Sequence, residues 1–329
     1  MRLTALKVLK ILKNESDKNH PLTLQKIADR LAEESDLTGN STRGNRHTAR
    51  AYIEALQEDD YPIVRTNSGY YIEPDFEDAE LRMLIDSVLF SNLPLDTAEK
   101  LIEKLKKLGN KRFKPKVRHV YNLSKLKRSD NEQIMSSIDI ISDAISLHKK
   151  ISFTYNSYGT DFLLHPRSSE PYKVSPYQMV TANGRYYLIS NTEGHDNISH
   201  YRIDRMTDVK MLNEPARELL SESNPITDCI GGLNLPKHLA EHIYMFSGET
   251  ISVKFWTDDF MMDCLIDWFS KDFRILKEQD NTILVEVNVN EQAIKYWIMQ
   301  FGEFVEVVTP VSLREKIYDN AKKIMNAHH

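Results

Sequence analysis

Arginine and tyrosine occur together in two neighbouring segments, residues 184–190 and 199–206, which read as adjacent β-strands. Asn183-Gly184, at the start of the first segment, is a strong signal for a hairpin turn. Arginine supplies a planar fork of five N–H donors that suits phosphate or carboxylate, and a tyrosine ring supplies a face for stacking. The combination predicts a pocket for an anionic, nucleotide-like ligand.

Tyr186-Tyr187-Leu188 resembles the Trp-Tyr-Leu triplet that gives the WYL family of bacterial regulators its name, and Tyr201–Arg205 resembles that family's second, arginine-bearing signature. The resemblance implies a ligand-sensing transcription factor with a small SH3-like or Sm-like barrel that senses nucleotides or nucleic acid, including single-stranded DNA. It also implies that tyrosines and arginines contact the ligand. The ligand-binding residues that we expect are Tyr155, His165, Arg167, Lys173, Arg185, Tyr187, Arg202 and Arg205.

Packing and ion pairing are alternative roles for these side chains. Tyr186 and Tyr187 would equally serve as core residues. The alternative for Arg202 and Arg205 is an ion pair with a nearby acid: Asp204, Asp208 or Glu170. A regular strand would also put the two arginines on opposite faces, so their convergence on one pocket requires a bend or bulge near Asp204.

The segment 149–213 predicts five short strands around these motifs, and we expect it to form the sensor domain. Ile151–Tyr155 alternates with period two, and Phe162–Pro166 follows as a second strand. Pro171 and Pro176 forbid a regular central ladder in the approach to the third strand. Five short strands in about 60 residues cannot bury two faces as a flat sheet, so a small curled barrel is expected.

Residues 1–73 predict three helices followed by a hairpin, which is the order of a winged helix-turn-helix. Thr23 caps the second helix, the third spans about residues 45–59, and Thr66–Gly69 marks the hairpin turn. No acid occurs from Gly39 to Ile53. A three-helix bundle that binds protein is the alternative, but it does not explain an acid-free helix in an acidic chain.

The third helix also resembles that of the DeoR-like winged helices that usually precede WYL domains. Arg46-His47-Thr48 followed by Arg50 stands where that family tends to have Arg-Arg-Thr and a later arginine. This departure leaves the base contacts open. We expect the third helix to enter the major groove and the hairpin to lie on phosphates. The expected DNA-binding residues are Arg43, Asn45, Arg46, His47, Arg50, Arg65 and Asn67.

Residues 74–148 predict a helical linker, which serves either as a dimer interface or lever or for internal packing alone. A basic run from Lys104 to Arg128 contains no acid. It has three open interpretations: a solvated face, a phosphate-contacting arm, or part of the sensor's rim.

Residues 233–329 predict a C-terminal α+β domain whose element order, βαββαβα, suggests a ferredoxin-like unit. This part resembles the extension that follows many WYL domains. Its tryptophans, Trp256, Trp268 and Trp297, are expected in the core. The chain as a whole is therefore expected to be an α+β multidomain protein.

Composition limits the class of protein. With 329 residues, 41% hydrophobic and 28% charged, the chain suits a soluble protein of two or three domains. No stretch approaches the roughly 18–20 apolar residues that a membrane span needs. Cys229 and Cys264 lack metal-ligand spacing, so a reducing cytoplasm is the simplest setting. Because the net charge is −5, DNA binding would depend on local clusters of positively charged residues.

We expect no catalytic machinery in this chain. We identify in its sequence no Gly-rich phosphate loop, zinc signature or catalytic cluster. His195, His200 and Asp204 share no fixed spacing that would make them a metal site. We therefore expect no enzymatic activity, no cofactor and no metal.

These patterns together predict a ligand-responsive transcriptional regulator. A homodimer would place two recognition helices in successive major grooves of a double-stranded DNA operator. A nucleotide or single-stranded nucleic-acid effector, bound at Arg202 and Arg205, would favour one spacing of the two heads. The alternative is a non-transcriptional accessory protein that binds single-stranded nucleic acid through the barrel and uses its N-terminal head for protein contacts.

Overall fold

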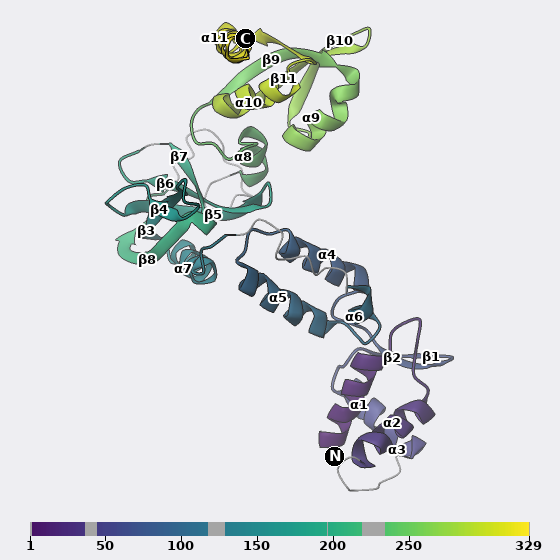
Figure 1. The fold of residues 1–329 in the computed structure, drawn as a ribbon. Helices are drawn as coiled ribbons and strands as arrows, with labels where there is room; N and C mark the ends of the chain where they lie inside the picture. The colour runs from purple at the N-terminus through teal and green to yellow at the C-terminus, as the bar shows by residue number, and fades with distance from the viewer. Residues whose placement is uncertain (1, 37–44, 118–128, 196, 219–233, 329) are drawn as a thin grey trace. The chain divides into compact units, whose positions relative to one another are not determined.

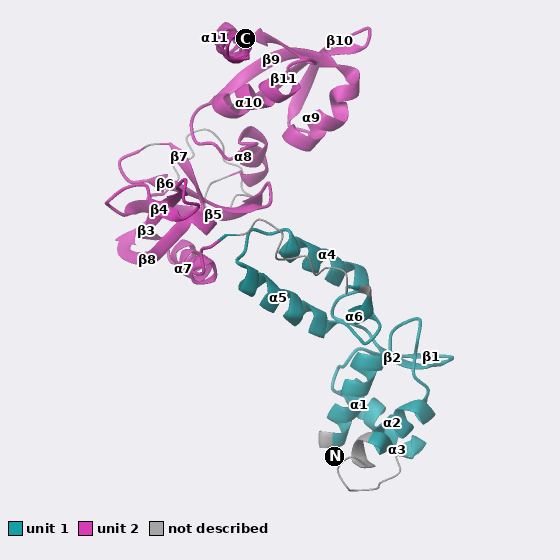
Figure 2. Ribbon diagram, viewed as in Figure 1, with its two compact units in different colours: residues 1–129 teal, residues 130–329 magenta. Residues whose placement is uncertain are grey.

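The computed structural model describes residues 2–36, 45–117, 129–195, 197–218 and 234–328 (Figure 1). The chain divides into two compact units, Met1–Ser129 and Asp130–His329 (Figure 2). The fold is mixed α/β, and its described strands form a hairpin, a curled six-stranded sheet and a four-stranded sheet. No helix in the described ranges combines the length and apolar character needed to cross a membrane.

The first unit begins with three helices and a hairpin: α1 (Arg2–Glu15), α2 (Leu24–Asp36), α3 (Arg46–Glu58), β1 (Ile63–Thr66) and β2 (Gly69–Ile72). Local capping sets two of the helix starts. The Thr23 hydroxyl accepts a hydrogen bond from the Lys26 N–H at 3.2 Å, and the Asn45 side chain accepts one from the His47 N–H at 2.8 Å. The expected helices and hairpin are therefore confirmed.

A short bridge attaches the hairpin to the helices. Leu22 and Tyr70 exchange two backbone hydrogen bonds of 2.8 Å each. Gly69 makes this approach possible, because its φ is +149° and a Cβ there would lie 2.3 Å from the carbonyl oxygen of Leu22. The apolar sides of all three helices and the hairpin close into one core that includes Leu12, Ile27 and Ile53.

A helical hairpin completes the first unit: α4 (Asp78–Leu89), α5 (Leu95–Leu108) and the short α6 (Phe113–Lys116). Its own small core contains Leu81, Ile85 and Ile102.

Several members of the basic run are paired with acids in this unit. The buried Lys106 ammonium donates to Glu103 at 2.9 Å. Lys111 pairs with Glu15 at 2.6 Å, and Arg112 pairs with Asp17 at 3.1 Å. This part of the run is therefore engaged within the protein rather than being a uniformly solvated face. Its remainder, 118–128, lies outside the described residues.

The second unit begins with α7 (Ile134–Ser146) and the curled sheet. The strands are β3 (Lys149–Tyr158), β4 (Leu164–Pro166), β5 (Tyr172–Ala182), β6 (Arg185–Thr192), β7 (Ile198–Arg202) and β8 (Met206–Pro215). The order is β4-β3-β5-β6-β7, and β8 pairs with Lys149–Tyr155 of β3. All described pairings are antiparallel. The expected curled sheet is confirmed, and β8 is a sixth strand that the sequence did not predict.

Three local irregularities of the sheet occur at particular residues. Asn183 and Gly184 have φ of 50° and 69°, which is the left-handed pair that a tight hairpin needs. The register of β5 against β6 shifts between Pro176 and Gln178, so the expected irregularity at this proline is confirmed. β7 ends at Arg202 and passes into a 3₁₀ turn, Ile203–Arg205, instead of continuing as a strand.

Helix α7 packs with the sheet, in particular against β8. The Asn131 amide donates to the carbonyl oxygen of Met206 at 2.6 Å, and the Asp208 N–H donates to the Gln133 side chain at 2.8 Å. These contacts are non-local in sequence. They join the α7 region to the curled sheet, and the second compact unit begins at Asp130.

The C-terminal part opens with α8 (Leu235–Glu241), a helix that the sequence analysis did not predict. The elements that follow are β9 (Thr250–Asp258), α9 (Met262–Phe269), β10 (Phe273–Gln279), β11 (Thr282–Asn290), α10 (Glu291–Phe301), β12 (Val305–Thr309) and α11 (Val311–Ala327). The antiparallel sheet has the order β10-β11-β9-β12. Trp297 is fully buried in its core, and Trp268 packs against that core.

Candidate anion-binding site

Four aromatic side chains cluster on the curled sheet. Phe153 and Tyr155 come from β3, Tyr172 from β5 and Tyr201 from β7. Their ring centroids lie 5.0–6.2 Å apart, and most pairs meet edge to face. Phe153 and Tyr172 stack with an interplanar angle of 9°. Aromatic pairs at these separations favour a rigid cluster.

Tyr155 links this aromatic cluster to the arginines. Its hydroxyl accepts a hydrogen bond from the main-chain N–H of Arg202 at 3.2 Å. The guanidinium carbon of Arg167 lies over the same ring, 5.0 Å from its centroid. Backbone pairing holds Arg167 there, because its N–H donates to the carbonyl oxygen of Tyr155 at 2.9 Å.

Arg205 is the last residue of the 3₁₀ turn that follows β7. Burial raises the pKa of the Tyr155 hydroxyl, while the positive charges of Arg205, Arg167 and Arg202 act in the opposite direction. The positive charges of all three arginines therefore act on the same phenol. The bend near Asp204 that convergence requires is present at Ile203–Arg205.

Arg202 and Arg205 differ in their pairing. Arg202 donates to both carboxylate oxygens of Asp204, at 3.1 and 2.7 Å, and only 4% of the Asp204 side chain is exposed. Arg205, in contrast, has a buried Nε with no hydrogen-bond partner. Arg202 thus has the ion-pair role that the sequence left open for it, and Arg205 retains a donor for a ligand.

Comparison with known protein families matches the WYL domain to residues 136–211 and the WCX domain to residues 249–325. The chain therefore contains a WYL domain followed by a WCX domain. The WYL match begins within α7 and ends at Met211 of β8, so it covers the site around Tyr155 and the curled sheet except for the end of β8. The WCX match covers the whole four-stranded sheet, α9, α10 and α11 up to Met325.

Two solved structures resemble the chain at low identity. Proteasome accessory factor B/C (PafBC) of Arthrobacter aurescens is 13% identical, with 95% of this chain and 47% of that chain covered and a TM-score of 0.30. The chain thus spans about half the length of the PafBC chain. A CRISPR Cas-related protein is 16% identical, with 99% and 83% covered and a TM-score of 0.42. Neither reaches a TM-score of 0.5, so neither bears on function. No curated protein matches the sequence.

The other expected ligand residues of the WYL domain have different surroundings. Tyr187 is buried in a hydrophobic cluster with Val180, Ile189 and Met245, so it has the packing role that was its alternative. His165 is exposed and pairs with Asp161 at 2.8 Å. The remaining two, Lys173 and Arg185, are exposed near the starts of β5 and β6.

The expected DNA-binding residues lie at the start of α3 and on the hairpin. Arg46 and His47 are exposed on the first turn of α3. Asn45 is the N-cap, so its side-chain oxygen is already used. Arg50 lies 3.4 Å from Glu54 in a surface ion pair. Arg65 and Asn67 are exposed on the hairpin, and Arg43 lies outside the described residues.

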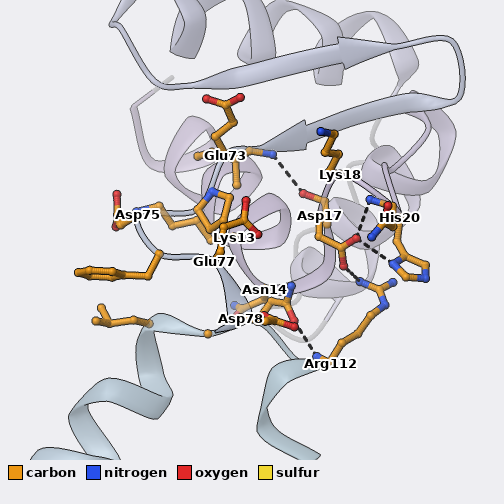
Figure 3. Close-up of a pocket in the computed structure, with 18 of the residues that line it drawn as sticks. Lys13, Asn14, Asp17, Lys18, His20, Glu73, Asp75, Glu77, Asp78 and Arg112 are labelled. Atoms are coloured by element: carbon orange, nitrogen blue, oxygen red, sulfur yellow. Dashed lines mark hydrogen bonds and ion pairs between the residues drawn. The ribbon is translucent and has the colours of Figure 1, made fainter. Parts of the chain in front are cut away.

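A pocket of about 570 Å³ lies within the first unit, where the three-helix region meets the helical hairpin. Figure 3 shows Asp17 between His20 and Arg112, with which it pairs at 2.8 and 3.1 Å. Other acids and bases also line the pocket, including Glu73 and Lys18. Because its acids and bases are mixed, this pocket is less suited to an anion than the arginine site of the WYL domain.

Sequence reasoning missed a group of three histidines. His200 of β7 meets His238 and His242 of the α8 segment, with candidate ligand nitrogens all within 4.8 Å of one another. His195 and Asp204, the neighbours first considered for His200, do not belong to this group. The spacing of His238 and His242, four residues apart, was a visible signal in the sequence. Their meeting with His200 depends on tertiary packing.

Proposed function

We propose that this protein is a ligand-responsive transcriptional regulator, acting in the cytoplasm, whose WYL domain binds an anionic nucleotide or single-stranded nucleic acid. The observation that carries the proposal is that Arg167 covers the Tyr155 ring, while Arg205, whose charge acts on the same phenol, has a buried Nε without a partner. Arginine forks suit phosphates, and aromatic faces suit bases.

Each arginine has a distinct role in this proposal. Arg205 offers its unpaired Nε–H to a phosphate oxygen. Arg167 is exposed and lies over the Tyr155 ring. It can move off the ring to bind a phosphate, which would free the ring face to stack on a base. Arg202 is held by Asp204 and positions the Tyr155 hydroxyl through its main-chain N–H. Because Asp204 is paired with Arg202, this buried acid is not available as a catalytic group. We therefore propose that the site binds its ligand without catalysing a reaction.

The first unit supplies the DNA-binding head of the proposed regulator. Three helices and a hairpin, joined by the Leu22–Tyr70 bridge, have the order of a winged helix-turn-helix. Arg46 and His47 would meet base edges or phosphates from the exposed start of α3. Arg65 and Asn67 would contact phosphates from the wing.

The remaining elements suit dimerisation and coupling. Met83 and Phe90 of the α4 region are 71% and 68% exposed, which supplies apolar surface for a second copy of the chain. A homodimer would present two heads to successive major grooves. The strand order of the WCX domain, β10-β11-β9-β12, suits the ferredoxin-like arrangement expected from its element order.

Fluorescence anisotropy with labelled single-stranded DNA, single-stranded RNA and cyclic dinucleotides tests the sensor. We expect wild type to bind at least one of these, and Arg205→Ala and Arg167→Ala each to weaken that binding about tenfold or more, since a charge-assisted hydrogen bond contributes roughly 1.5–3 kcal/mol. Lys210→Ala, which removes an exposed charge from β8 of the same sheet, is the matched control. Wild-type-like affinity in both arginine variants would contradict the site.

Duplex binding separates the proposed regulator from the accessory-protein alternative. A regulator binds a specific duplex in a mobility-shift experiment over fragments of its own genome, and the effector changes that affinity. Single-stranded binding that depends on Arg205, together with no specific duplex binding, would instead favour the accessory protein.

A further inference from the structure

Three imidazole rings meet where α8 packs on β7. The ring centroid of His200 lies 5.0 Å from those of both His238 and His242, and the latter two stack at 4.1 Å. The Nε2 atoms of His200 and His238 are 2.7 Å apart. Such close approach of three imidazoles from two separate elements is typical of a metal centre.

The site is largely buried. His238 and His242 are each only 6% exposed. A metal ion binds a ring lone pair of each imidazole, and one candidate nitrogen from each of the three rings is available within this cluster.

Backbone contacts orient the rings. The Nδ1 of His242 lies 3.0 Å from the carbonyl oxygen of His238, a contact in which the ring must donate. This fixes the tautomer and leaves the lone pair of His242 on Nε2, as in many metal-binding histidines. The main-chain N–H of His200 donates to Ser247 Oγ at 3.2 Å, which holds β7 against the segment after α8. His200 Nδ1 is buried without a partner.

We propose that His200, His238 and His242 form a transition-metal site, with Zn²⁺ as the expected ion, that clamps α8 to the WYL domain. An all-imidazole set suits Zn²⁺, Cu²⁺ or Ni²⁺, rather than Mg²⁺ or Ca²⁺. Tetrahedral Zn–N bonds of about 2.0–2.1 Å put ligand nitrogens about 3.3 Å apart. The His200–His238 contact therefore has to open by about 0.6 Å, which small ring rotations supply. A water or small anion would complete the coordination.

The local sequence also contains a zinc signature that the sequence analysis overlooked. His238-Leu239-Ala240-Glu241-His242 has the H-x-x-E-H spacing of one class of zinc peptidases, in which the glutamate has a catalytic role. Here the Glu241 carboxylate lies 3.9 Å from the Lys237 ammonium, and the third histidine of the group is His200 of β7. We assign the ion a structural role, because its ligands join β7 to the α8 segment.

The consequence concerns communication between domains. Besides β7, α8 contacts α9 and β11 of the C-terminal part, and the Asn183 amide donates to the Ile243 carbonyl oxygen at 3.1 Å. An ion held by both β7 and α8 would fix the WYL sheet to the segment that leads into the WCX domain. Loss of the ion would loosen that attachment without removing a residue of the arginine site.

Zinc binding by full-length protein tests the proposal. The protein is stripped with a chelator, dialysed and titrated with Zn²⁺ against a competing indicator, and bound zinc is counted by mass spectrometry. We expect one zinc per chain in wild type. His200→Gln, His238→Gln and His242→Gln should each weaken binding by at least about a hundredfold, since even second-shell changes cost ten- to a hundredfold. His195→Gln and a His328→Ala, His329→Ala double variant should bind like wild type.

A second measurement keeps the test valid if a variant fails to fold. Wild type loaded with Co²⁺ should show the strong visible absorption of a four-coordinate site, and Zn²⁺ should raise its melting temperature. The proposal is overturned if wild type binds less than half an equivalent of zinc, if the three folded variants bind like wild type, or if the His328, His329 double variant loses binding.

Discussion

Arg202 and Asp204 form a two-point ion pair at the end of β7, with hydrogen bonds of 3.1 and 2.7 Å between the guanidinium and the carboxylate. The pair closes the 3₁₀ turn from which Arg205 extends. Two arginines three residues apart therefore have different tasks: one neutralises a buried acid, and the other is available to a ligand.

We expect Arg202→Ala to destabilise the second unit by about 2–4 kcal/mol, because it removes a two-point charge partner of a buried carboxylate. Arg205→Ala should cost less than about 1 kcal/mol, since it deletes a buried Nε that has no partner. Urea unfolding, followed by fluorescence of the second unit, measures both. Equal losses in the two variants would contradict the assigned roles.

Gly69→Ala should destabilise the hairpin of the first unit by about 1–3 kcal/mol, because the new Cβ would clash with the Leu22 carbonyl and break the bridge to Tyr70. Gly194→Ala is the control, since φ there is +81° but a Cβ would meet nothing within 4 Å. Amide exchange at Leu22 and Tyr70, whose N–H groups form the bridge, reports the local effect. Unchanged exchange at these two amides would rule out the clash.

Glu15→Gln should reduce the loss of stability of the first unit in acid. Burial acts to raise the pKa of Glu15, but hydrogen bonds from Lys111 and Arg30 outweigh it and leave that pKa below the ordinary 4.5. A carboxyl with a lowered folded pKa stabilises the protein above its unfolded pKa and loses that contribution as pH falls through the folded value. As the pH is lowered from about 5 to about 3, the melting temperature should therefore fall less steeply in the variant than in wild type.

The control for this pH effect is Asp96→Asn. Asp96 belongs to an exposed pair with Lys100, and such surface pairs contribute little. A Glu15→Gln profile parallel to that of wild type would show that Glu15 does not contribute to the acid sensitivity.

Arg46→Ala should weaken duplex binding and lower the slope of log affinity against log salt by about one unit, as expected for one lost phosphate contact. If Arg46 instead reads a base, affinity should fall at one operator position while the salt slope stays nearly constant. Lys100→Ala, an exposed and paired lysine on α5, is the charge-matched control. Wild-type affinity and slope in Arg46→Ala would remove α3 from the interface.

Local chemistry made much of the fold predictable from the sequence. The caps at Thr23 and Asn45 start their helices through hydrogen bonds to residues two or three positions away. Asn183-Gly184 forms its turn because it tolerates positive φ. Such signals depend only on neighbouring residues in the chain, so they can be recognised without knowing the tertiary packing. Strand β8 was missed, because what defines it is its pairing with β3, far away in the sequence.

The residue types by themselves determined that tyrosine and arginine would occur together on the strands of the WYL domain, because strand alternation and side-chain chemistry can be read from the chain. Tertiary structure decided which arginine is paired, since the turn after β7 sets Arg202 against Asp204 and leaves Arg205 Nε without a partner. It also brought His200 to His238 and His242. Residues far apart in sequence meet only when distant apolar surfaces pack, and no local pattern encodes that encounter.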